Sequence, residues 1–401
     1  MTALSSHCDG RVIHDADSHI VEGVGFMESF ASKYVLDNLD PPFFDFNNMD
    51  ALKPFFEQAE KRLNGEDPEL TAKLKANVLG DPQKINMWAA FGAKDRAERR
   101  ESLDLVGINK QLVFPGLVFV SRFAKSNDLD VVYGGSEAHN RGMVEFCSVD
   151  PERLLAVGYL SLKDPARALA SAKQSIEMGV KSLWIHSDAY DDRAPSHIDY
   201  DPIWALMEEA GVPISLHIGS GAKIPAAYAN TGVKREFGAG KVINVETTSP
   251  KDIPVLHHSI ERWLMCMIYD GVLERFPKLK VGLIELGANW LPACMFNLDM
   301  GAKELGKFDL GLKKLSLKPS EYITRQVRAT PLHFEDTGWI LRNVGKEVLM
   351  FNTDYPHPEG GADPFGDFQR SLDAVNATKE ELDAFYSKNF EDFAGCCFVA
   401  F

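Results

Sequence analysis

Short apolar runs rich in β-branched residues alternate along the chain with longer segments in which apolar residues recur about every 3.6 positions. Eight such runs occur, at residues 11–13, 111–114, 154–160, 181–185, 212–216, 279–284, 326–329 and 347–351. This alternation is typical of parallel βα units. Eight strands with helices between them predict an α/β fold, most simply a closed (β/α)8 TIM barrel. An open doubly wound sheet is the rival, but no G-x-G-x-x-G sequence follows the first run.

The helical segments between these runs are clearest at 164–178, 201–210 and 251–276. In the first segment Ala168, Ala172 and Ile176 recur every four positions, so they share one face of a helix. Pro254 is expected in the first turn of the third helix, where a missing N–H is tolerated. These segments therefore predict helices that pack an apolar face against the sheet.

The main departure from a minimal barrel is the stretch 36–110, between the first and second predicted strands. It contains a charged helical pattern at 94–105, so we expect an ordered insertion rather than a linker. Loops that follow barrel strands lie on the face that carries the active site, and from there the insertion could cover a substrate. The loop 219–248 is a second candidate for that role. We predict one domain that spans residues 1–401.

Composition narrows the classes of partner. The 43 basic and 58 acidic residues give a formal net charge of −15, which disfavours nucleic acid and anionic membranes. The chain contains no apolar stretch of about 18 residues and no secretory signal pattern, so we expect no membrane association and a cytoplasmic location. The six cysteines contain no C-x-x-C pair and are expected to be reduced.

Polar side chains follow several predicted strands at the point where each strand ends. Asp17 and His19 follow the first run, His217 the fifth, and Asp354 the eighth. Active sites of barrels lie at these strand ends, and Asp17 and His19 are two positions apart, so they point the same way on an extended segment. Two imidazoles and two carboxylates predict a site for one divalent metal ion, Zn²⁺ first and Mn²⁺ second.

Each of these residues alone has a simpler explanation. A strand-end aspartate can cap the following helix, and a lone histidine can be a satisfied structural residue. Their joint occurrence at the ends of predicted strands favours the metal site.

The segments around these residues resemble a known family. The matching stretches are 15–22, 201–204, 216–219, 276–281, 285–290 and 352–357. They resemble the amidohydrolase-related proteins, which include aminocarboxymuconate semialdehyde decarboxylase and γ-resorcylate decarboxylase. The resemblance covers about residues 11–395 except 36–94, and it implies a TIM barrel, a metal held by Asp17, His19, His217 and Asp354, and a homo-oligomer, either a dimer or a tetramer.

One departure from the family pattern concerns the chemistry. The best-known decarboxylases of this family end their sixth strand in a catalytic histidine, whereas this chain has Glu285. His257 or His258, which precede that strand, could substitute for the missing imidazole. His357 resembles a substrate-facing residue of the family.

The leading functional hypothesis is a metal-dependent hydrolase acting on a small, aromatic-derived acid through a metal-activated water. Asp354 would accept the proton, and Glu285 or His357 would return it to the leaving group. The alternative is a non-oxidative decarboxylase or another carbon-carbon lyase that uses the same site. A third hypothesis is a barrel that binds a small molecule without catalysis.

Several further residues are candidates for binding the substrate. His186 follows the fourth strand, and Arg328 in the seventh could bind a carboxylate. Aromatic residues flank the strand ends and are expected to line an apolar pocket; these are Trp184, Trp290, Tyr355, Phe351 and Phe119.

Overall fold

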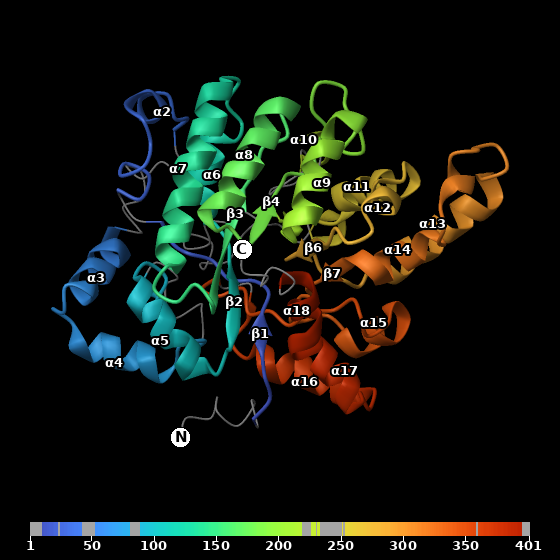
Figure 1. Cartoon of the computed structure of the whole chain (residues 1–401). Helices are drawn as coiled ribbons and strands as arrows, with labels where there is room; N and C mark the ends of the chain where they lie inside the picture. The colour runs from blue at the N-terminus through green and yellow to red at the C-terminus, as the bar shows by residue number, and fades with distance from the viewer. Residues whose placement is uncertain are drawn as a thin grey trace.

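The computed structural model describes residues 10–22, 25–41, 53–80, 89–218, 226–229, 231–232, 251, 253–357 and 360–394. Its centre is a curled, entirely parallel sheet in which each strand pairs with the next one along the chain (Figure 1). The seven strands are β1 (His14–Asp15), β2 (Lys110–Val113), β3 (Leu154–Tyr159), β4 (Ser182–Trp184), β5 (Ile214–His217), β6 (Val281–Ile284) and β7 (Val327–Ala329).

The segment 348–355 hydrogen-bonds to both edges of this sheet. On one side Met350 N donates to Ala329 O of β7 (2.9 Å), and on the other Ala16 N donates to Phe351 O (3.0 Å) and Asp354 N to Asp17 O (2.9 Å). The eighth predicted strand, 347–351, is thus a single parallel bridge between Ala329 and Leu349 rather than a regular strand. The structure has the α/β fold with a curled parallel sheet that the barrel prediction requires.

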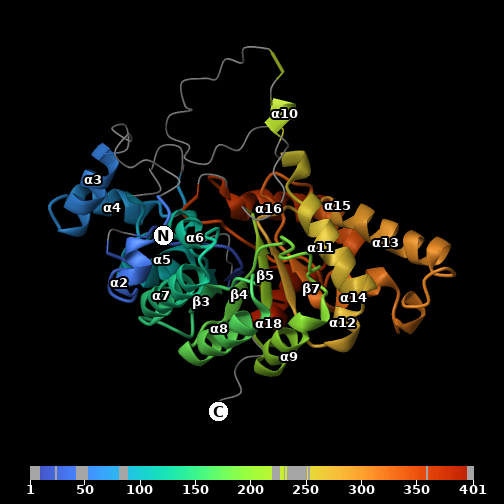
Figure 2. The same cartoon turned by 90° about the horizontal axis from the view of Figure 1, so that it is seen from above.

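Helices cover the outer side of the sheet (Figures 1 and 2). Those between β2 and β6 are α6 (Leu117–Phe123), α7 (Leu129–Cys147), α8 (Pro165–Met178), α9 (Asp201–Ala210), α11 (His258–Tyr269) and α12 (Val272–Arg275). The short helix α10 (Ala226–Ala229) lies away from the sheet in Figure 2. Those after β6 are α13 (Leu291–Leu305), α14 (Pro319–Gln326), α15 (Thr337–Val344), α16 (Pro364–Ala374), α17 (Lys379–Asp383) and α18 (Asn389–Ala394).

Local sequence sets the ends of the helices that were predicted. Helix α8 begins after Asp164, whose carboxylate accepts a hydrogen bond from Arg167 N, and ends at Gly179 in the left-handed conformation. Helix α9 likewise ends at a left-handed glycine, Gly211. Both agree with the predicted ranges 164–178 and 201–210.

The prediction of one continuous helix at 251–276 is wrong. The chain forms a short 3₁₀ turn, Ile253–Val255, and then α11 and α12, which are separated at Gly271 with φ +72°. Pro254 lies in the 3₁₀ turn instead of the first turn of α11. The left-handed glycine interrupts the helical path although the apolar periodicity continues through it.

Between β1 and β2 the described residues form four α-helices, α2 (Lys33–Asp37), α3 (Lys53–Leu63), α4 (Pro68–Ala76) and α5 (Arg96–Val106). Helix α5 corresponds to the pattern predicted at 94–105. Figures 1 and 2 place α3, α4 and α5 at one side of the sheet, opposite α13. Arg62 of α3 donates to the Glu98 carboxylate of α5 at 2.9 Å, which ties these helices together. The segments 42–52 and 81–88, and most of the loop 219–248, lie outside the described residues.

The strands are buried, and the side chains of Val157, Leu183, Leu216 and Leu283 are inaccessible to solvent. A largely apolar core therefore supports the strand ends. Within the described part of the chain, no helix has both the length and the apolar character to cross a bilayer.

Candidate functional site

The predicted metal ligands come together at the carboxyl ends of the strands. Asp17, His19, His217 and Glu285 can each offer one ligand atom such that all four atoms lie within 4.8 Å of one another. A second such group overlaps it and consists of His19, Glu285, Asp354 and His357. All of these side chains are buried. The two groups therefore form one site, which we call the acid-imidazole cluster.

The separations within this cluster suit a single ion. His19 Nε2 lies 3.2 Å from His217 Nε2, and Asp17 Oδ1 lies 3.4 and 3.5 Å from these nitrogens. Asp354 Oδ1 is 3.5 Å from His19 Nε2, and Glu285 Oε2 is 3.4 Å from His217 Nε2. Atoms that bind one ion at about 2.1 Å lie roughly 3.0–3.5 Å apart. The cluster thus has the spacing of a ligand shell.

Backbone carbonyls orient both imidazoles. His19 Nδ1 lies 2.9 Å from Pro115 O, and His217 Nδ1 lies 3.1 Å from Ile218 O. A carbonyl can only accept, so each Nδ1 carries the proton and donates it. Each Nε2 then directs a lone pair into the cluster, as metal-binding histidines require.

The charges also favour a cation. Burial acts to raise the pKa of Asp17, but its interactions with His19 and His217 outweigh burial and hold the pKa well below its usual range. Burial, helped by the charge of His357, lowers the pKa of His19 to about 3. Neither Asp17 oxygen accepts a hydrogen bond from the described residues. A buried carboxylate that accepts no such hydrogen bond fits a divalent metal ion, which would supply the positive partner that it lacks.

Two acids of the cluster have unusual backbone geometry. Glu285 and Asp354 have φ values of +56° and +52°, a region that costs a non-glycine residue about 1 kcal/mol or more. Glu285 N donates to Thr330 Oγ1 at 2.9 Å, and Asp354 N donates to Asp17 O at 2.9 Å. Neighbouring strands therefore hold both residues in conformations that sequence patterns do not reveal.

Glu335 supports the turn that follows Glu285. Its carboxylate accepts hydrogen bonds from Ala288 N (2.9 Å), Asn289 N (3.1 Å) and Leu332 N (2.9 Å). A Cβ at Gly287, which has φ +65°, would lie only 2.8 Å from Glu335 Oε1. Sequence patterns do not reveal this contact, because the two segments are nearly fifty positions apart.

Asp15 supports the opposite side of the cluster. It accepts hydrogen bonds from Thr353 N (2.9 Å), Thr353 Oγ1 (2.6 Å) and Gln111 Nε2 (2.7 Å). Burial raises its pKa to about 7, and these hydrogen bonds oppose the rise. Arg99 of α5 extends the network, because its guanidinium donates to Gln111 Oε1 at 3.2 Å and to His19 O. The sequence signals of this network were Asp15, at the end of the first apolar run, and the polar Gln111 within the second run.

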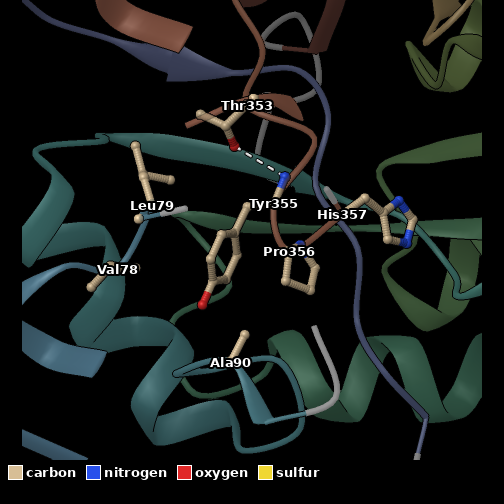
Figure 3. Close-up of a pocket in the computed structure, with 9 residues that line it drawn as sticks. Val78, Leu79, Ala90, Thr353, Tyr355, Pro356 and His357 are labelled. Carbon is tan, nitrogen blue, oxygen red and sulfur yellow. Dashed lines mark hydrogen bonds between the residues drawn. The ribbon is translucent and has the colours of Figure 1, made fainter. Parts of the chain in front are cut away.

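His357 joins the cluster to a pocket. Its Nδ1 lies 3.0 Å from Asp354 Oδ1, and its ring stacks on His19 with the centroids 4.1 Å apart. A small pocket beside it is partly open to solvent (Figure 3). Tyr355, Pro356 and His357 form one wall of this pocket, and Val78, Leu79 and Ala90 lie across it.

The other predicted substrate contacts lie at different distances from the cluster. Tyr355 lines the pocket, with its hydroxyl donating to Phe91 O at 2.7 Å. His186 packs edge-on against Trp184, whose ring in turn contacts His217 at 5.8 Å between centroids. Both Trp184 and His186 thus lie beside the cluster without belonging to it.

Trp290 and His257 form a separate contact. Their rings stack with centroids 5.0 Å apart and an interplanar angle of 8°, and Trp290 Nε1 donates to Gly287 O at 3.0 Å. His257, His258 and Glu261 could hold an ion as a third group, but none of them belongs to the acid-imidazole cluster.

Arg328 is not brought to the cluster. Its guanidinium pairs with Asp392 of α18 at 2.5 Å and donates to the backbone carbonyls of Thr324 and Val327. Phe351 is fully buried against Phe365, Phe368 and Phe385. The side chain of Phe119 lies outside the described residues.

Known proteins are similar to this chain in sequence. The Amidohydro_2 (amidohydrolase) family model matches residues 85–392. Decarboxylase orsB of Emericella nidulans is 25% identical over 254 residues, which are 61% of this chain and 70% of that protein.

Two solved structures are similar across nearly the whole chain. The amidohydrolase map2389c of Mycobacterium avium subsp. paratuberculosis has a TM-score of 0.69 at 20% identity, covering 96% of this chain and 99% of that one. The 5-carboxyvanillate decarboxylase LigW2 of Novosphingobium aromaticivorans, with bound manganese and 3-methoxy-4-hydroxy-5-nitrobenzoic acid, has a TM-score of 0.63 at 18% identity, covering 96% and 97%.

Proposed function

The chain belongs to the amidohydrolase family, and we propose that within this family it is a metal-dependent, non-oxidative decarboxylase of a small aromatic acid. The leading hypothesis from the sequence was a hydrolase, with a decarboxylase as the alternative, and we now favour the decarboxylase. The observation that carries the proposal is the acid-imidazole cluster, in which His357 is hydrogen-bonded to Asp354, one of the candidate metal ligands. The decarboxylases among the similar proteins favour the same choice.

Asp17, His19, His217 and Asp354 would hold the ion, with Glu285 as a fifth possible ligand. Nitrogen and carboxylate donors together suit Mn²⁺ and Zn²⁺. The solved structure of a similar decarboxylase contains manganese, which favours Mn²⁺. When bound, a divalent ion would neutralise the carboxylate and hydroxyl oxygens of an aromatic acid and orient its ring.

Asp354 and His357 would transfer the proton. The carboxyl of Asp354 delivers it to the ring carbon that bears the substrate carboxylate. The bond between that carbon and the carboxylate then breaks, its electron pair returns to the ring, and CO₂ leaves. His357, hydrogen-bonded to Asp354 at 3.0 Å, passes a proton from solvent back to Asp354. The net reaction takes up one proton and consumes no water.

Glu285 is the specific observation that favours a second candidate, a hydrolase. It takes the place of the histidine expected at the end of the sixth strand in the decarboxylases of this family. A carboxylate 3.4 Å from His217 Nε2 could activate a water molecule as a general base. In that case the substrate would be an ester or amide of an aromatic acid.

Isotope labelling separates the two candidates. Protein loaded with Mn²⁺ or Zn²⁺ would be incubated with hydroxybenzoic acids in ²H₂O, and the products would be analysed by mass spectrometry. We expect CO₂ and an arene with one deuterium at the vacated position. Hydrolysis of ester or amide analogues, with ¹⁸O incorporated from labelled water and no release of CO₂ from the acids, would reject the decarboxylase.

A further inference from the structure

We propose that the insertion between β1 and β2 sets substrate specificity, by forming an apolar pocket for an alkyl substituent on the ring of the aromatic acid. The inference rests on the proposed function and extends it to a substrate class. Figure 3 shows the pocket, with residues of the insertion facing the segment that carries His357.

The insertion supplies apolar side chains to this pocket. Val78 and Leu79 follow α4, and Ala90 precedes α5; each is less than a tenth exposed. Across the pocket lie the ring of Tyr355 and Pro356. The described residues of these walls offer contact to carbon and no charge, so they suit an apolar group.

Three polar side chains among the described lining residues already make hydrogen bonds. The Tyr355 hydroxyl donates to Phe91 O at 2.7 Å, and Thr353 Oγ1 donates to Asp15 at 2.6 Å. His357 Nδ1 is engaged by Asp354. Because both hydroxyl hydrogens are already donated, a substituent that needs a hydrogen-bond donor would lose its hydration without gaining a hydrogen bond from these atoms, which disfavours it.

Hydrogen bonds fix the insertion wall relative to the cluster. Besides the Tyr355 contact, Val21 N donates to Ala93 O at 2.8 Å, and the Arg99 guanidinium donates to His19 O. These three contacts join the insertion to the segments that carry His19 and Asp354. The wall therefore stands at a set distance from the reacting end of the substrate, as selection by size requires.

The proposal is tested by replacing Leu79 with a smaller and with a larger side chain. Metal-loaded wild type, Leu79→Ala and Leu79→Phe would be titrated calorimetrically with salicylate and with its ring-methylated and ring-propylated derivatives. We expect Leu79→Ala to raise the affinity for a propyl derivative over that for the methyl derivative by about 10-fold relative to wild type. Leu79→Phe should weaken the alkylated derivatives about 10-fold while salicylate itself binds as before. A general loss of stability cannot produce these opposite changes.

Leu74→Ala is the matched control, because Leu74 is a buried leucine of α4 that does not line the pocket. It should leave the ratios between the ligands unchanged. Unchanged ratios in both Leu79 variants would overturn the pocket, even in an enzyme that releases CO₂. Shifted ratios without CO₂ release would support the pocket and count against the decarboxylase. Failure of the wild type to bind any salicylate would overturn the proposed substrate class.

Discussion

At the scale of single residues, His217 tests the cluster most directly. It lies at the end of β5, within 3.5 Å of candidate ligand atoms of Asp17, His19 and Glu285. We expect His217→Ala to bind well under half the metal of wild type after both are dialysed against Mn²⁺, because one of two oriented imidazoles is lost. Plasma mass spectrometry measures the ratio. His186→Ala serves as the control and should keep its metal; full occupancy in His217→Ala would remove His217 from the shell.

The residues that sequence predicts best are those whose role depends on their place at a strand end. Asp17, His19, His217 and Asp354 were predicted as one set, and the structure brings them together. Arg328 shows the limit of that reasoning. A position on β7 says nothing about the partner of a long side chain, and here the partner is Asp392, more than sixty positions away.

At the scale of elements, the apolar runs in the sequence predicted the positions of β2 to β7, because a buried parallel strand needs continuous apolar side chains. They could not give the exact strand ends, which depend on pairing with a neighbour. The break at Gly271 and the contact of Glu335 with the turn after β6 were invisible for the same reason. Both depend on how the chain meets itself in space.

Glu335 yields a prediction about that turn. In Glu335→Gln one acceptor oxygen becomes an NH₂ group that faces backbone N–H donors, so the turn should shift and misplace Glu285. We expect affinity for Mn²⁺ to fall about 10-fold in chelator competition. Asp336→Asn is the matched control, since asparagine caps α15 about as well as aspartate. If both variants bind the metal like wild type, Glu335 supports the fold alone.

Glu381 yields a prediction about pH. Hydrogen bonds from Arg342, and then from Thr378 N, lower its pKa to about 2, whereas an unfolded glutamate titrates near 4.3. Because the folded pKa is the lower one, the stabilisation is complete above about pH 5 and is lost as pH falls toward 2. Glu381→Gln should therefore have a lower urea midpoint than wild type at pH 7, by an amount that shrinks at pH 3.5. With Arg342→Ala as background the substitution should have less effect; a difference that stays constant with pH would refute the ion pair.

At the scale of the whole molecule, the predicted dimer or tetramer stays a prediction, and one surface offers a test. Apolar side chains are exposed on α13 and the turns after it, with Phe296 at 67% and Phe308 at 77%. Exposed apolar side chains grouped on one element favour self-association. If the chain is a homo-oligomer through this surface, Phe296→Ser with Phe308→Ser should lower the molar mass measured by light scattering. An unchanged oligomer would assign the interface elsewhere, and a monomeric wild type would reject the prediction.

The cluster also links metal binding to the stability of the entire fold. Its ligands come from the ends of β1, β5 and β6, or directly after them, and from the segment that joins the two edges of the sheet, so one ion would connect strands across the curled sheet. An ion that binds the folded chain alone stabilises it by about 4 kcal/mol at a thousandfold excess over Kd. We expect chelated protein to melt several degrees below the same protein with Mn²⁺. The difference should largely disappear in Asp17→Asn, because that substitution removes a charged ligand and leaves the shape of the site. An equal metal-dependent rise in that variant would mean that the ion stabilises the protein from another site.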